Sequence, residues 1–282
     1  MIESGRDLLW CAAVLYTISF AFALSALVRN RLHNRPLFMV GLGIGLFLQS
    51  WGLYQRGMAV EGCPLGNPFE MIQFVTWSAM VLYFVIGPVF RMSLLGFFSA
   101  AMASVGGLAS LAFPALDSEY EIGYFGGDAW IEAHAALAVF SYGIFGVLAL
   151  TSLMYLSQNY GLKKQRGQGV FRFLPSIFEL DQVNFRLLVL GVLIFSLSLI
   201  PGWAYWVNSQ DTVTTFKLIS TVAVWLAYLT LLIFRLLGQV SASRLSLIAL
   251  FLFLVALLSL APVDRSRYLP EQDGVENQEA TS

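Results

Sequence analysis

The stretch Gly62–Trp77, GCPLGNPFEMIQFVTW, lies between two long apolar runs and carries a carboxylate into the start of the second. Asn67 is a favourable N-cap residue, Pro68 suits the first helical position, and Glu70 falls at the third. A glutamate there can bond back to the cap and interact favourably with the helix dipole. The stretch predicts a helix that begins at Pro68. If capping is the main role of Glu70, a Glu70→Gln change should be mild.

Apolar runs of this kind recur along the whole chain. It has 282 residues, of which 58% are hydrophobic and 12% charged, and its mean hydropathy is +0.73. A soluble domain of this length does not hide so much apolar surface, so the composition predicts an all-α, polytopic membrane helix bundle. Eight runs are long enough to span: 8–28, 36–55, 68–90, 93–114, 131–157, 184–205, 214–236 and 245–262. We expect residues 1–262 to form one transmembrane domain and 263–282 a flexible acidic tail.

The charges between the runs predict the orientation in the membrane. Eleven of the sixteen Lys and Arg residues lie on one side of the predicted bundle, with only two of the seventeen acidic residues, Glu179 and Asp181. Because basic loops stay in the cytoplasm, the other side, with both termini, is predicted to be periplasmic. We call these the inner and outer sides, and we expect the bacterial cytoplasmic membrane. Topology accounts for the basic residues, so no nucleic-acid partner is expected.

The sequence lacks the short motifs of soluble enzymes. It contains no GxSxG, P-loop, HExxH or paired-cysteine metal spacing, so we expect no enzyme activity from the chain on its own. The two cysteines, Cys11 and Cys63, are not part of a CxxCH motif, which excludes a cytochrome of the c type. Cys63 lies in an outer loop, where it is either a redox thiol or an incidental residue.

Histidine is the informative residue, because the chain has only two. His33 lies among arginines in an inner loop and is interpreted as a solvated residue. His134 lies one turn into the fifth run, at its outer end, and shares a helix face with Ala138 and Ser141. Ionisable residues inside membranes are by default functional hypotheses, and the small residue below the imidazole would leave room for a flat macrocycle. The alternative is a histidine that bonds to a neighbouring carbonyl or to water.

Three separated stretches resemble the cytochrome c assembly family of haem-handling membrane proteins (CcsA-type, with HemX-like relatives). Residues 63–77 resemble the family's pattern of Pro-Leu, Asn, an aromatic, Glu, Phe and Trp. His134, followed by AVFSYG, resembles its histidine with a Ser-Tyr pair in the same helix. Residues 174–191, LPSIFELDQVNFRLLVLG, resemble its Leu-Asp, aromatic-Arg and Gly pattern. The resemblance covers roughly residues 45–240.

The resemblance implies haem near the outer face, with His134 as the iron ligand. The other residues that it marks as cofactor contacts are aromatic or acidic: Trp130, Trp203, Tyr205, Trp206 and Asp211. Lys217, or arginines near the outer surface, could face the haem propionates. The sixth position of the iron would be open or filled by a weaker ligand such as Met58, because the last span ends in APVDRSRY, where the family has a second outer histidine.

The chain also departs from the family's tryptophan-rich outer segment. Its stretch 201–220, PGWAYWVNSQDTVTTFKLIS, is shorter and has Thr-Val-Thr where the family has Pro-Lys-Glu. A complete bis-histidine haem synthetase site is therefore not expected.

Two roles remain open from the sequence. The first is haem handling in cytochrome c biogenesis, with haem, the lipid bilayer and a partner cytochrome c assembly membrane protein as partners. The alternative is a non-haem scaffold or regulator that supports a cytochrome assembly or haem-synthesis protein. A transporter is disfavoured because the spans lack charges and paired broken helices.

Overall fold

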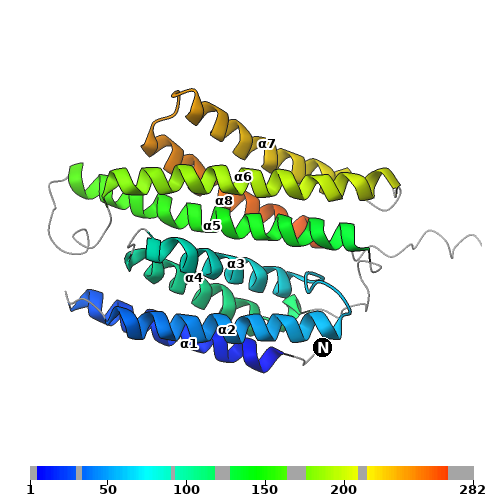
Figure 1. Ribbon diagram of the computed structural model, residues 1–282, viewed down its shortest axis with the longest axis horizontal. Coiled ribbons are helices and arrows are strands. Elements are labelled where there is room, and N and C mark those ends of the chain that lie inside the picture. Colours follow the sequence, from blue (N-terminus) through cyan, green and yellow to red (C-terminus); the bar gives the residue numbers. More distant parts are fainter. Residues whose placement is uncertain are drawn as a thin grey trace, which may run out of the picture.

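The computed structural model describes residues 5–29, 34–89, 93–117, 128–163, 176–208 and 215–265, and over these residues it is all-helical. The long helices lie roughly side by side along the long axis of the molecule (Figure 1). They are α1 (Arg6–Val28), α2 (Arg35–Ala59), α3 (Pro68–Val89), α4 (Ser93–Ala112), α5 (Ala129–Lys163), α6 (Ile177–Asn208), α7 (Thr215–Leu236) and α8 (Ala242–Arg265). A short 3-10 helix, η1 (Pro114–Leu116), follows α4.

Each predicted span coincides with one of these helices, which confirms the predicted fold class. Within the described residues, seven helices are long and apolar enough to cross a membrane, and α8 has a shorter apolar segment over Ala242–Leu258. The main difference concerns α5 and α6, which have 35 and 32 residues and begin or end well outside the predicted runs. At 1.5 Å per residue these helices are roughly 50 Å long, more than the ~30 Å of a hydrocarbon core. The predicted runs are shorter because hydropathy identifies only the apolar part of a helix, whereas the polar turns beyond that part are helical as well.

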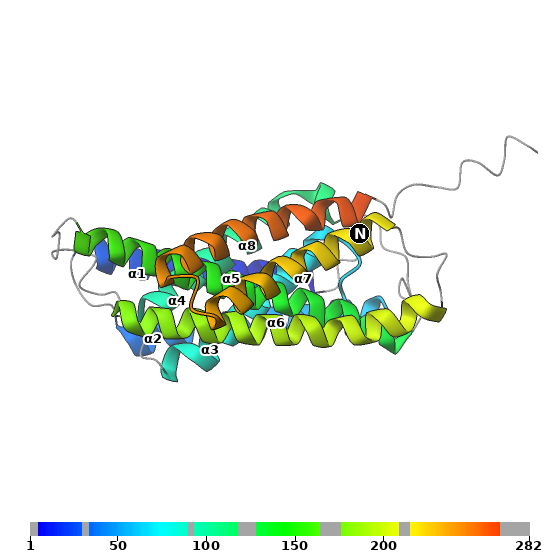
Figure 2. The same ribbon diagram turned by 90° about the horizontal axis from the view of Figure 1, so that it is seen from above.

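The helices form two groups joined through α5. Helices α1–α4 pack on one another, and α5 packs against α3 and α4 on one side and against α6 and α8 on the other. Helix α7 lies across α6 and α8 at the edge of the bundle (Figures 1 and 2). Gly143 makes the α3–α5 contact possible, because a Cβ there would lie 2.3 Å from the Cβ of Ser78.

One end of the bundle gathers the segments that the sequence predicts to be outer. These segments are the start of α1, the loop 60–67, η1, the start of α5 and the end of α6. Helix α6 extends beyond the ends of α1–α4 at this end of the bundle (Figure 1). This end carries the candidate site. Helix α8 continues to Arg265, and the rest of the predicted acidic tail lies outside the described residues.

Candidate functional site

The imidazole of His134 packs onto α6. Its Nδ1 lies 2.7 Å from the backbone carbonyl oxygen of Ser198. A carbonyl oxygen can only accept a hydrogen bond, so Nδ1 carries the proton. In the neutral ring the free lone pair is then on Nε2. The hydrogen bond orients the ring and selects the nitrogen that is available to a ligand.

A Pro-Gly pair in α6 makes room for this contact. Pro201 lies inside the helix and has no N–H to donate to the carbonyl one turn before it, which weakens the helix there. At Gly202 a Cβ would lie 2.6 Å from Nδ1 of His134, so the ring occupies the space of a side chain. The sequence does carry this signal, since Pro-Gly interrupts an apolar run, but it does not reveal which residue fills the gap.

Three tryptophans lie within one helical turn of this contact along α5 and α6. Trp130 lies one turn before His134, and Trp206 lies one turn after Gly202, so both continue outward along the faces of α5 and α6 that meet at the histidine. The rings of Trp203 and Trp206 are in contact, with centroids 5.1 Å apart and a 49° tilt. Trp130 and Trp203 are 61% and 64% exposed. The structure therefore gathers four predicted site residues at the outer end of the α5–α6 pair.

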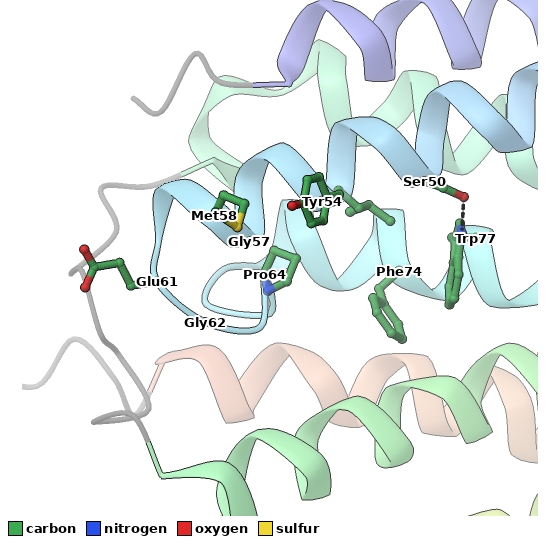
Figure 3. Close-up of a pocket in the computed structure, with 10 residues that line it drawn as sticks. Ser50, Tyr54, Gly57, Met58, Glu61, Gly62, Pro64, Phe74 and Trp77 are labelled. Atoms are coloured by element: carbon green, nitrogen blue, oxygen red, sulfur yellow. Dashed lines mark hydrogen bonds between the residues drawn. The ribbon is translucent and has the colours of Figure 1, made fainter.

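Of the other predicted site residues, one lies beside this group of four, and the rest either lie apart from it or fall outside the described residues. Tyr205 lies in the same turn of α6 as the two tryptophans and is partly buried. Asp211 and the side chain of Lys217 lie outside the described residues. Met58 lines a cavity whose walls come from α2, the loop 60–67 and α3, and not from α5 or α6 (Figure 3). His134 is not among the residues that line this cavity.

Four charged residues that the sequence reasoning did not connect form a buried cluster at the same end of the bundle. Arg56 of α2 donates from Nε to Glu70 of α3 at 2.9 Å and from Nη2 to Asp117, just after η1, at 2.7 Å. Arg6 of α1 also pairs with Asp117. The side chains of Arg56 and Glu70 are 1% and 0% exposed. This outer ion network, Arg6, Arg56, Glu70 and Asp117, joins α1, α2, α3 and the segment after α4.

The network corrects two expectations. Arg56 and Glu70 lie within helices that can cross a membrane, so the spans do carry charges, as buried pairs near their outer ends. Arg56, the one charged residue between Arg35 and Glu61 and directly after the predicted run 36–55, was the signal for this. The second correction concerns the cap. Asn67 is the N-cap as predicted, because its Oδ1 accepts the N–H of Glu70 at 2.8 Å. The Glu70 carboxylate, however, accepts the N–H of Gly66 at 2.9 Å instead of bonding back to Asn67.

The Leu-Asp motif has a structural role at the opposite, inner end. Nη2 of Arg235 donates to both carboxylate oxygens of Asp181, at 2.7 and 2.6 Å, and Nη1 donates to the carbonyl of Val240 at 2.9 Å. The motif thereby joins α6 to α7 and to the turn before α8. Ser176 and Glu179 form a reciprocal capping box at the start of α6.

Cys63 does not have the environment of a reactive thiol. Burial, with smaller effects from Glu132 and Glu70, raises the pKa of its thiol to about 11. The reactive form of cysteine is the thiolate, so Cys63 stays protonated at neutral pH. This favours an incidental residue over a redox centre. Over the described residues, no group of three or more His, Cys, Asp or Glu side chains could hold a metal ion.

Comparison with known proteins bears on all three motif stretches. A family model described as Cytochrome C assembly protein matches residues 65–264, which include Glu70, His134 and Asp181. Protein HemX of Bacillus subtilis (strain 168) is 28% identical over 256 residues, 87% of this chain and 90% of that protein. Protein HemX of Brevibacillus brevis is 29% identical over 194 residues, 67% and 69% of the two chains. Cytochrome c biogenesis protein CcsA of Cyanidium caldarium is 25% identical over 230 residues, 64% and 72%.

Proposed function

Because the chain belongs to the cytochrome c assembly protein family, we propose that it handles haem in cytochrome c biogenesis, at the outer end of the α5–α6 pair. It is a multi-pass membrane protein of that family. In this proposal it lies in the bacterial cytoplasmic membrane and acts beside a second cytochrome c assembly membrane protein. It binds or passes on haem and contributes at most part of a haem-attachment complex.

The hydrogen bond of His134 is the observation that supports the proposal most. Histidines that ligate a metal commonly donate their other ring N–H to a carbonyl or carboxylate, which fixes the ring and raises the basicity of the free nitrogen. The Nδ1–Ser198 bond of 2.7 Å is a contact of this kind, and it leaves Nε2 free. Nε2 of His134 is therefore the proposed iron ligand.

The aromatic side chains around His134 suit the apolar faces of a porphyrin. Trp130, Trp203 and Trp206 present large, partly exposed rings, and Tyr205 lies in the same turn of α6. Lys217 is proposed to face the propionates, because its ammonium complements their negative charge. Asp211 is proposed as a further cofactor contact, because it follows these aromatics in the sequence. When bound, haem supplies the iron and the redox chemistry. The residues of the chain would bind it, orient it and limit its contact with water.

A non-haem scaffold is the second candidate function, and the count of histidines favours it. His33 is the only histidine besides His134 and belongs to the predicted inner side, so no second outer histidine is available. A scaffold would keep the bundle and its ion pairs and would use its surface to support a cytochrome assembly or haem-synthesis partner.

A visible spectrum of the full chain, purified in mild detergent, separates the two functions. Haem bound through His134 should give a Soret band that shifts on addition of imidazole or carbon monoxide, because the sixth position is weakly held or open. His134→Ala should lose this band at an unchanged protein level. His33→Ala, the matched control, should keep it. A wild-type protein that carries no haem and takes up none when haem is supplied would establish the scaffold function instead.

A further inference from the structure

A cavity of about 570 Å³ lies between α2, the loop 60–67 and α3 (Figure 3), and His134 is not among its lining residues. Its walls are mainly apolar: Leu53, Tyr54 and Met58 of α2, Pro64 of the loop, and Phe74 and Trp77 of α3. Ser50, at the deep end, already accepts from Nε1 of Trp77 at 2.8 Å and donates to the carbonyl of Leu46 at 2.7 Å. The deep end therefore suits an apolar occupant.

The cavity opens sideways, toward the lipid. Helix α2 exposes a continuous apolar stripe, formed by Leu37, Val40, Ile44, Phe47, Trp51, Tyr54 and Met58. A stripe of this kind, spaced at three or four residues, is one face of a helix, and in a membrane protein it faces the bilayer. Tyr54 and Met58, 58% and 64% exposed, belong both to the stripe and to the cavity wall. Lipid molecules can thus reach the cavity without crossing water.

The depth of the cavity matches one leaflet. Ser50 lies nine residues before the last residue of α2, Ala59, and Trp77 lies nine residues after the first residue of α3, Pro68. At 1.5 Å per residue, the cavity extends about 14 Å along the helices from the loop. Half of the hydrocarbon core is about 15 Å. An acyl chain of one leaflet therefore has the right length.

The mouth of the cavity is acidic. Glu61 lies at the mouth, and its exposed carboxylate points outward, away from the aromatic walls (Figure 3). Glu132 of α5 lies against the same loop, because a Cβ at Gly62 would be 2.6 Å from its Oε1. Within the part of the chain that the structure describes, neither carboxylate has an ion-pair partner, whereas Arg56 is engaged by Glu70 and Asp117. Negative charge here complements a cationic headgroup.

We propose that this cavity is a binding site for an aminophospholipid of the outer leaflet. One acyl chain lies between α2 and α3 against Phe74 and Trp77, and the ammonium group lies near Glu61 and Glu132. The acyl chain would also support the contact between the two bundle halves, because Trp77 packs edge-on against Phe140 of α5, with ring centroids 6.4 Å apart.

Photolabelling of the full chain in lipid vesicles tests the site. The vesicles contain phospholipids with a diazirine on the acyl chain and either an ethanolamine, a choline or a glycerol headgroup, and labelled residues are mapped by mass spectrometry. We expect labels to concentrate on Met58, Phe74 and Trp77. Ethanolamine lipid should exceed choline lipid by about two- to fivefold, because both headgroups are cationic but only the primary ammonium has N–H groups to donate to the exposed carboxylates.

Two variants separate the acyl-chain and headgroup contributions. Phe74→Trp narrows the cavity and should lower its labelling. Phe47→Trp, on the lipid-facing stripe of α2 but outside the cavity, should not. The double variant Glu61→Gln with Glu132→Gln should remove the preference for ethanolamine lipid over choline lipid.

Three outcomes would overturn the proposal. Equal labelling of Phe47, Trp51 and the cavity would indicate ordinary annular lipid. A preference for the glycerol headgroup would contradict the role of the carboxylates. Cross-links from the cavity to residues 118–127, without lipid labels, would identify the chain itself as the occupant.

Discussion

Replacing Glu70 by glutamine tests whether the outer ion network stabilises the fold. Glutamine keeps the size of the side chain and can still accept the N–H of Gly66, but it removes the charge that faces Nε of Arg56 at 2.9 Å. Two guanidinium groups, of Arg6 and Arg56, must then share the single carboxylate of Asp117. The variant therefore leaves one buried positive charge without compensation.

The expected loss of unfolding free energy lies between that of breaking a buried ion pair and that of losing one hydrogen bond to a charged group. Removing one partner of an isolated buried ion pair costs about 3–5 kcal/mol, and losing a hydrogen bond to a charged group costs about 1.5–3 kcal/mol. Because Arg56 keeps its 2.7 Å contact with Asp117, we expect Glu70→Gln to lower the free energy of unfolding by about 2–4 kcal/mol. Denaturant unfolding in mixed micelles measures this difference.

Glu179→Gln is the matched control, since Glu179 has the same position in a helix cap but is exposed and outside any buried ion pair. It should change stability little. The double variant Arg56→Gln with Glu70→Gln leaves Arg6 and Asp117 as a balanced pair, so its loss should be smaller than the sum of the two single losses. If Glu70→Gln were as mild as Glu179→Gln and the double variant were additive, the network would not stabilise the fold and capping would be the main role of Glu70.

Three further predictions concern topology, the histidine and the cysteine. Reporter fusions at Ser118 and Gln168 should show periplasmic and cytoplasmic activity respectively, and reversed signals would contradict the orientation. Gly202→Ala should displace the imidazole of His134, because the new Cβ would lie 2.6 Å from Nδ1; ring ¹⁵N shifts that stay at the Nδ1–H tautomer would contradict this. With the pKa of Cys63 raised from 9.0 to about 11, its thiolate fraction at neutral pH is about 100-fold below that of an ordinary thiol. Its alkylation should therefore be slow and should accelerate up to about pH 11; fast alkylation at pH 7 would refute the buried environment.

Local patterns were sufficient to predict the helices. The start of α3 at Pro68 follows from Asn67 and Pro68 themselves, and the structure has the cap hydrogen bond at 2.8 Å. The extra length of α5 and α6 could not be predicted in this way, because their ends are polar turns that extend beyond the apolar runs. Backbone hydrogen bonds and caps, such as the Ser176–Glu179 cap, keep such turns helical. A hydropathy pattern contains no information on these bonds.

The sequence predicts where His134 lies but not which residues it contacts, because the contacts of the site connect residues far apart in the chain. The position of His134 at the outer end of a span follows from hydropathy and helix geometry. Its contact with Ser198 joins residues 64 positions apart, and the pair of Arg6 and Asp117 joins residues 111 positions apart. Spacing within one helix carries no information on such pairs. A lone charged residue at the end of an apolar run, such as Arg56, does indicate that a partner exists, but only the packed bundle shows which one.

The two sequence interpretations of His134, a histidine bonded to a carbonyl and a haem ligand, are compatible with each other. The bond to Ser198 uses Nδ1 and its proton, whereas iron ligation uses a nitrogen lone pair. A histidine held by a carbonyl therefore presents Nε2 in a fixed direction, while a histidine without that bond would be free to rotate and to exchange tautomers. Loss of the Soret band in His134→Ala would show only that the residue is needed. Loss of the band in Gly202→Ala, with the imidazole still present, would show that its orientation is needed as well, and this result separates a positioned ligand from an adventitious one.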